Sequence, residues 1–553
     1  GAELANITAG TLNIGNSSTG NITVDGISAA NSNNATTVNL TTANTSSVNF
    51  SSNASTFHAL GVSSGNGITQ NVSITTSGVA TLDADSNDDG SGDFSNTAGT
   101  VSTGGSALSI TANDFGLSGA INTGTGTTTI LISDGGSIGL GSTAGNMTIT
   151  GSELGNITAG TLTIGDSTAG AITVNGITSA NSTNIITVDL NSPSIAFSTG
   201  DSTFKGLTAT ANTGAITGTA ALTVEGNSTF ATNTDNQPIT LNNASNYFMG
   251  AVSLNTTGSS ANTTLATNSA VNLGISTIGG DHSVTVGGTS KTINVSGVQD
   301  IGGTITLQSS GNLTLTSSLT SSSNSNSAIS LTSTGGGIFD GDSDGSTDIT
   351  AVNGGLVVVS NAGFGTSDNS IETALSSIDI INNTNGSVNI YEMDSLEIRA
   401  INQNVDGEDI TVSYSGSLSG RNLATIPENS LGVKTFTQRQ TLPVSAKDQV
   451  LEGAGKSVGA LSVESTVQLA KTVENDVIQM TFQSSSGNKS IASLVSGGSM
   501  NSYVTDIFSN SNTLVQFSDD IKETNATSFG QGRLGDKTIE EAKVAKLEPS
   551  PKS

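Results

Sequence analysis

Several residue types that most proteins use are missing or scarce in this sequence. Cysteine and tryptophan are absent, which excludes a disulfide framework and thiol chemistry, although a large secreted protein can draw stability from repetition instead. Only six prolines occur, and Pro193 and Pro238 alone precede residue 420. Charged residues make up 11% of the chain. This composition argues against a disordered low-complexity polymer, which usually has frequent proline, dense charge and no hydrophobic period.

Basic residues are scarce over most of the chain, and the net charge is −28. Residues 1–420 contain 30 Asp and Glu but only Lys205, Lys291 and Arg399, which gives this part a charge of −27. Because this part cannot neutralise phosphates, we expect no nucleic-acid partner and no anionic lipid surface. Divalent cations or basic surfaces suit it better.

Membrane segments and leader sequences are not evident. No apolar run approaches the roughly 18 residues of a membrane span, so we expect no transmembrane segment. No signal peptide is visible at Gly1, and the chain starts inside a repeat unit, which suggests a processed or excised polypeptide.

The chain contains an internal duplication. NITAGTLNIG (residues 6–15) returns as NITAGTLTIG (residues 156–165), and residues 1–40 share 26 identities with residues 151–190 without a gap. After a shift of three residues the match continues, since FSSNASTFHAL (residues 50–60) aligns with FSTGDSTFKGL (residues 197–207). The duplication therefore covers about residues 1–85 and 151–232, and the chain was built by copying a unit.

Short segments in which aliphatic residues alternate with Thr, Asn or Ser recur throughout residues 1–420, as in TLNIG (residues 11–15) and TITL (residues 304–307). This alternation is typical of a strand with one buried face, and the bounding Gly, Asn and Asp favour tight turns. Such strands allow a sandwich, a barrel or a solenoid. The duplication favours the solenoid, because each copied coil can stack on the last. We therefore predict an all-β fold, a right-handed parallel β-helix, over residues 1–420.

The expected dimensions follow from the spacing of stacked strands. Coils of about 20 residues at about 4.8 Å give about 21 coils and a rod near 100 Å long, with seven or eight coils in the 150 residues from the start of one copy to the start of the next. Stacked Asn and Thr side chains are expected to form ladders along the axis, each bonded to its equivalent one coil away.

The amino-acid composition changes after residue 420, where Lys, Arg and Pro become more frequent. We expect residues 421–535 to form an irregular, mostly β region that caps the open edge of the rod. Residues 536–553 are expected to form a short helix, in DKTIEEAKVAKLE (residues 536–548), followed by a frayed tail.

The repeated NITAGTLxIG motif, SGAINTGTGTTTI (residues 118–130) and TSTGGGIFDGDSDG (residues 332–345) resemble the filamentous-haemagglutinin type of secreted β-helix proteins and related giant repeat adhesins. The resemblance covers about residues 1–415. It implies a right-handed parallel β-helix, export to the cell surface or extracellular space, and a role in attachment or surface layers. The amino-terminal secretion domain of that family is absent from this sequence.

Two aspartate-rich turns, DSNDDGSGD (residues 85–93) and DGDSDGSTD (residues 340–348), share one pattern. Each places oxygen-bearing side chains at its first, third, fifth and ninth positions and glycine at its sixth. This is the first part of a calcium loop, in which a tight turn directs hard oxygen ligands to one point. The twelfth position, normally Glu, is Asn96 or Ala351, so an acidic surface turn is the alternative. The predicted Ca²⁺ ligands are Asp85, Asn87, Asp89, Asp93, Asp340, Asp342, Asp344 and Asp348.

Residues for catalysis are hard to find, although lyases and hydrolases also use β-helices. The three cations before residue 420 are isolated in the sequence, and His58 and His282 are lone histidines. A hydrolase pair could form across coils from residues such as Asp25 and Asp114. We predict no enzyme, no catalytic residue and no cofactor besides Ca²⁺.

These observations predict a non-enzymatic, extracellular structural or adhesive protein that associates with itself, end to end, into a filament or surface layer. One alternative is a monomeric rod-like adhesin that binds surface glycans or cell-surface proteins through its carboxy-terminal region. A carbohydrate-active enzyme is the second alternative, and a flat threonine array facing ice is the third.

Overall fold

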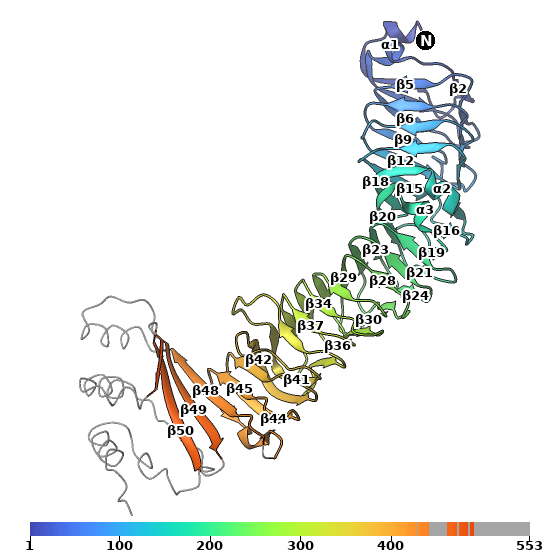
Figure 1. Ribbon diagram of the computed structural model, residues 1–553. Coiled ribbons are helices and arrows are strands. Elements are labelled where there is room, and N and C mark those ends of the chain that lie inside the picture. Colours follow the sequence, from blue (N-terminus) through green and yellow to red (C-terminus); the bar gives the residue numbers. More distant parts are fainter. Residues whose placement is uncertain (429, 442–461, 473–474, 485–486, 491–553) are drawn as a thin grey trace, which may run out of the picture.

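The chain winds into a long, curved rod (Figure 1). The computed structural model describes residues 1–428, 430–441, 462–472, 475–484 and 487–490. The fold is nearly all β, with 49% strand and 4% helix, and forms a parallel β-solenoid of about 20 turns. The predicted fold class is therefore confirmed.

Each strand buries one face, as the alternating sequence predicts. In β12 (Leu108–Ala112), Leu108, Ile110 and Ala112 are buried while the two residues between them stay partly exposed. Side chains of this kind from every turn form one continuous hydrophobic core along the axis. Small polar residues can fill the other face because it touches solvent rather than another layer.

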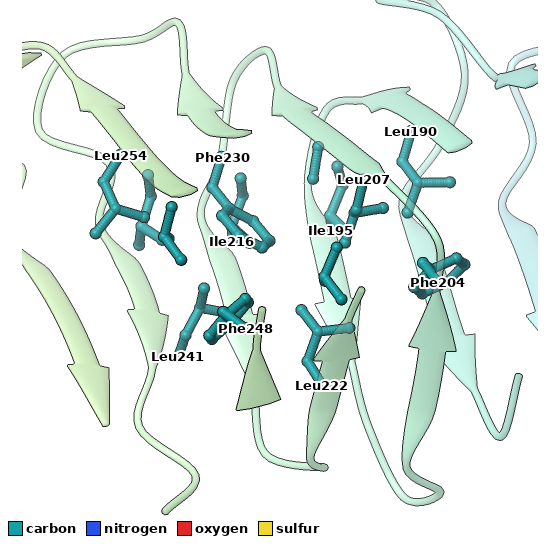
Figure 2. Packing of buried hydrophobic residues seen from close by; sticks show 14 of the residues in the cluster. Leu190, Ile195, Phe204, Leu207, Ile216, Leu222, Phe230, Leu241, Phe248 and Leu254 are labelled. Carbon is teal, nitrogen blue, oxygen red and sulfur yellow. The ribbon is translucent and has the colours of Figure 1, made fainter. Parts of the chain in front are cut away.

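Aromatic rings reinforce the core near the middle of the rod, where Figure 2 shows buried side chains from successive turns. Phe197, Phe230 and Phe248 come from β21 (Ile195–Phe197), β26 (Ser228–Thr232) and β28 (Tyr247–Phe248). Both neighbouring pairs of rings meet edge to face with centroids 6.3 Å apart. Edge-to-face pairs are a favourable arrangement for aromatic rings beyond the area that they bury.

The two copies of the duplicated unit occupy equivalent places on one ladder. Six successive parallel pairings lead from Asn13 to Thr163, its counterpart in the second copy. The strands on this path are β1 (Ala9–Gly15), β3 (Ala35–Thr41), β6 (Ala59–Ser63), β9 (Ala80–Asp83), β12, β15 (Thr127–Ile132) and β18 (Ile157–Ile164). The predicted seven or eight coils were wrong. Six turns separate equivalent positions of the two copies, because the corners are longer than expected.

The copies also share local detail. The short helices α1 (Ala29–Ser32) and α3 (Ser179–Ser182) occupy equivalent positions in the two copies. The partner of Ile22 is Val48, whereas the partner of its counterpart Ile172 is Ile195, which comes three positions earlier in the second copy. The shift of three in the sequence therefore falls in the loop before these partners, where a deletion leaves the strand register intact.

Asparagine ladders form as predicted. Asn212 donates from Nδ2 to Asn191 Oδ1 at 2.6 Å, and Asn233 Nδ2 donates to Asn212 Oδ1 at 2.9 Å. Asn39 bonds to Asn13 in the same way at 2.9 Å. Asparagine suits this role because its side chain carries both a donor and an acceptor.

A second ladder continues along the later turns and carries the region of interest. Its strands are β30 (Thr263–Thr267), β33 (His282–Val286), β36 (Ile305–Ser309), β39 (Ile329–Ser333), β41 (Ile349–Ser360), β42 (Ile371–Asn382) and β44 (Leu396–Gln403). Strands β41 and β42 are long because each turns a corner of the solenoid and joins two ladders.

The parallel stacking extends beyond the predicted boundary at residue 420. Strand β45 (Ile410–Tyr414) pairs in parallel with β48 (Lys434–Thr441). The pairing then becomes antiparallel through β49 (Ser462–Thr472), β50 (Asn475–Ser484) and β51 (Gly487–Ser490). The predicted helix at residues 536–548 and the tail lie outside the described residues. None of the described helices is long and apolar enough to cross a membrane.

Candidate functional site

Three acidic side chains from two successive turns converge near the later part of the rod. Asp340 ends β40 (Ile338–Asp340), Asp348 directly precedes β41, and Glu372 lies on β42 in the next turn. One oxygen from each lies within 4.8 Å of the others, so the three could share a metal ion. The exposed fractions are 9% for Asp340, 4% for Asp348 and 9% for Glu372. We call these three residues the acidic cluster.

Strand register brings the cluster together. Ile349 on β41 pairs with Thr373 on β42, which places Asp348 beside Glu372. The Asp348 N–H donates to the Glu372 carbonyl at 3.0 Å, and the Glu372 N–H donates to Asp348 Oδ2 at 3.1 Å. Across the loop, Asp340 Oδ1 accepts from the backbone N–H of Asp342 at 3.0 Å. Backbone N–H groups therefore hold the carboxylates of Asp340 and Asp348 in place.

The cluster is electrostatically unsatisfied. Asp340 Oδ2 and Glu372 Oε2 are buried and have no hydrogen-bond partner in the part of the chain that the structure describes. Burial, and after it the neighbouring Asp340 and Glu372 carboxylates, raise the pKa of Asp348 to about 8. Burial also raises the pKa of Glu372. Among the described residues, no Lys or Arg lowers the pKa of Asp348 or Glu372. A proton or a cation is therefore needed to relieve the repulsion between the acidic side chains.

The predicted calcium turn at residues 340–348 supplies two members of this cluster. Asp342 and Asp344 are exposed in the loop, and Asp344 Oδ1 accepts from the Ser346 N–H at 2.7 Å. Gly345 at the predicted glycine position has φ +72°, a left-handed conformation that glycine adopts readily. Glu372 was not among the ligands predicted from the sequence. Its signal is an acid at a buried strand position, one turn further along the solenoid than Asp348.

The other predicted turn, residues 85–93, is held by hydrogen bonds from the protein. Asp85 Oδ2 accepts from Ser133 Oγ at 2.7 Å and from the Gly90 N–H at 3.1 Å. Asp89 accepts from the Asn87 and Ser91 side chains, and Asp93 accepts from Asn113. The carboxylates of Asp85, Asp89 and Asp93 therefore already have donors, as the acidic-turn alternative expects, whereas Asn87 Oδ1 is buried without a partner among the described residues.

The residues considered for catalysis lie apart. Asp25 and Asp114 flank the first and last strands of a five-strand ladder, four pairings apart, or about 19 Å along the axis. That separation is too large for a hydrolase pair. Lys205, Lys291 and Arg399 are exposed on separate turns.

The two histidines differ in environment. His58 is exposed, and its Nδ1 lies 3.0 Å from the Thr36 carbonyl oxygen. His282 is 1% exposed, and its Nδ1 lies 2.6 Å from Thr263 Oγ1 while its Nε2 is buried without a partner. Neither histidine belongs to the acidic cluster, so no imidazole contributes a ligand atom to it.

The fold and site together define a repeat-built parallel β-solenoid with a buried acidic cluster between two turns. Residues 187–255 match a family described as Repeats of unknown function (DUF5649). This stretch runs from β20 (Ile185–Ser192) to β29 (Ala251–Thr256) and contains the packed core of Figure 2. No curated protein and no solved structure matches the chain.

Proposed function

We propose that this chain is a non-enzymatic structural rod of a cell surface or extracellular layer, and that it associates with itself end to end. The supporting observation is that turns with the same sequence pattern stack in parallel on both edges. Among the described residues, β1 pairs with β3 alone, whereas its copy β18 pairs with β14 (Ala120–Asn122) and β15 on one side and β20 on the other. The same strand sequence thus accepts a parallel neighbour on each edge.

The exposed side chains of the first turn fit this proposal. Ile7 and Ile14 are each 39% exposed, whereas their counterparts Ile157 and Ile164 are fully buried under the preceding turn. Any parallel turn placed on β1 would bury the apolar surface of Ile7 and Ile14 and pair the second edge of that strand, and another copy of this chain carries turns of matching sequence. Because such a contact joins different surfaces of two copies, it would repeat and produce a filament.

Electron microscopy and sedimentation of the purified polypeptide test the association. We expect filaments, or sedimentation that increases with concentration, for the wild type. The double variant Ile7→Lys and Ile14→Lys should remain single rods near 100 Å long, since charge at an edge blocks strand pairing. The matched control is Ile186→Lys, which replaces an isoleucine that is 52% exposed within the second copy. Single rods of wild type at high concentration would contradict the proposal.

The extracellular location and the adhesive role are supported by the resemblance to secreted repeat adhesins and by the acidic, cation-poor body. A monomeric adhesin that binds through its carboxy-terminal region remains the alternative. Deleting residues 421–553 would then abolish attachment to cells while leaving the β signal in circular dichroism. Assays for reducing ends or unsaturated uronides test the carbohydrate-active enzyme, and release of either product would overturn the non-enzymatic proposal.

A further inference from the structure

The acidic cluster has an arrangement that a surface turn does not need. Asp340, Asp348 and Glu372 are each at least nine-tenths buried, and their oxygens approach to within 4.8 Å. Asp340 Oδ2 and Glu372 Oε2 have no hydrogen-bond partner among the described residues. Buried carboxylate oxygens normally have a donor or a cation beside them, so these two atoms favour the binding of a cation.

We propose that Asp340, Asp348 and Glu372 bind one Ca²⁺ ion, which clips two successive turns of the solenoid together. Asp340 and Asp348 flank residues 341–347 on one turn, and Glu372 is supplied by the next. The site differs from the linear loop expected from the sequence because its third carboxylate comes from a different turn.

The donor set favours calcium among the common cations. All three ligands are carboxylates, which suit hard cations, and the cluster contains no histidine or thiol to favour zinc. Two oxygens bound to one Ca²⁺ are at most about 5 Å apart, which accommodates separations of up to 4.8 Å. Ca²⁺ also accepts six to eight oxygens in flexible geometry. Residues 341–346 are exposed and leave a route for water to complete the coordination.

The backbone contacts make the site suitable as a clip. Asp348 and Glu372 already exchange two hydrogen bonds between the turns, which hold the turns in register and position the Asp348 carboxylate. An ion at this place would replace the repulsion between three like charges by attraction to a shared cation. The stacking of β41 on β42 should therefore be stronger with the ion than without it.

Calcium titration by calorimetry, after removal of metal with EDTA, tests the site on the full chain. We expect one Ca²⁺ per chain at this site. Asp348→Asn and Glu372→Gln should each weaken binding by more than about tenfold, because each removes a charged ligand. Asp344→Asn is the matched control in the same loop, where the exposed side chain lies outside the cluster and acts on Glu372 only by its charge, so it should weaken binding far less than either ligand variant.

A second control variant tests whether the other acidic turn binds the ion, and titration with Mg²⁺ tests whether the site selects calcium. Asp89→Asn changes the turn at residues 85–93 and should leave calcium binding intact. If Asp89→Asn abolishes binding, or if Glu372→Gln binds like the wild type, the assignment to the acidic cluster is overturned. Equal affinity for Mg²⁺ would overturn the assignment to calcium.

Thermal unfolding separates loss of the ion from loss of the fold. Ca²⁺ should raise the midpoint of the wild type and of Asp344→Asn, and leave that of Glu372→Gln unchanged. In EDTA, Glu372→Gln should melt no lower than the wild type, since it lacks one of the repelling charges. A midpoint of the wild type that is the same in EDTA and in Ca²⁺ would overturn the proposed clip.

Discussion

The stability of the rod should depend on the protonation of one buried imidazole, that of His282. Burial lowers the pKa of His282 from 6.5 to about 4 in the folded chain. Its neighbours across the ladder are Thr263 and Ile305, which carry no charge. The adjacent Asp281 is exposed and accepts from the backbone and side chain of Thr304. No described neighbour on these strands therefore compensates a positive charge at this position.

The sign of the effect follows from the two pKa values. Between pH 6.5 and 4 the unfolded chain binds a proton at His282 and the folded chain does not, so acid favours unfolding. The stabilising contribution is complete above pH 6.5 and is lost as the pH falls towards 4. Lowering the pH from 7 to 5 crosses about 1.5 pH units of this window, which corresponds to about 2 kcal/mol of free energy of unfolding.

The assay is urea unfolding of the wild type and of His282→Gln at pH 7 and pH 5. Glutamine keeps a polar partner for Thr263 Oγ1 but does not titrate. The wild type should lose about 2 kcal/mol more than the variant on acidification, and the carboxylates cancel in this difference. His58→Gln controls for loss of an imidazole, because His58 is exposed. A wild-type-to-variant difference that is the same at both pH values would refute the reasoning.

Two further predictions concern the packing of the turns. Asn212→Ala breaks a ladder at two hydrogen bonds, to Asn191 and Asn233, and should lower the free energy of unfolding by about 1–2 kcal/mol in urea titrations. Asn272→Ala, at an exposed asparagine, is the control for this variant. If both variants lower the free energy of unfolding equally, the ladder does not stabilise the rod. Phe230→Ala empties a fully buried ring site and should cost about 3–5 kcal/mol. Met249→Ala, at a side chain that is 55% exposed, should cost less than about 0.5 kcal/mol.

Much of the body could be predicted because its physics is local and repeated. Alternation gave the buried faces of strands such as β12, and the duplication gave the stacking of one turn on the next. The asparagine ladders followed from the same stacking. The number of turns between equivalent positions of the two copies could not be predicted, because corner loops vary in length. The turn from Ile130 to its ladder partner Ile164 is much longer than the turn from Leu190 to Ala209.

The variation in loop length also explains why the sequence pointed to only two of the three residues of the acidic cluster. Asp340 and Asp348 were predicted because they lie in one turn with a recognisable spacing. Glu372 reaches them only through the register of β41 on β42, and that register depends on the length of the intervening loop. Parallel pairing also continues past the change in composition at residue 420, as far as the pairing of β45 with β48.

Distance measurement between spin labels tests the central claim, the stacking of successive turns along one axis. Because the chain has no cysteine, labels on Asn13→Cys and Thr163→Cys would be the only ones. Six pairings separate these positions, which predicts one narrow distance of about 29 Å. A broad distribution centred on about 65 Å, as an unfolded segment of this length would give, would contradict the account.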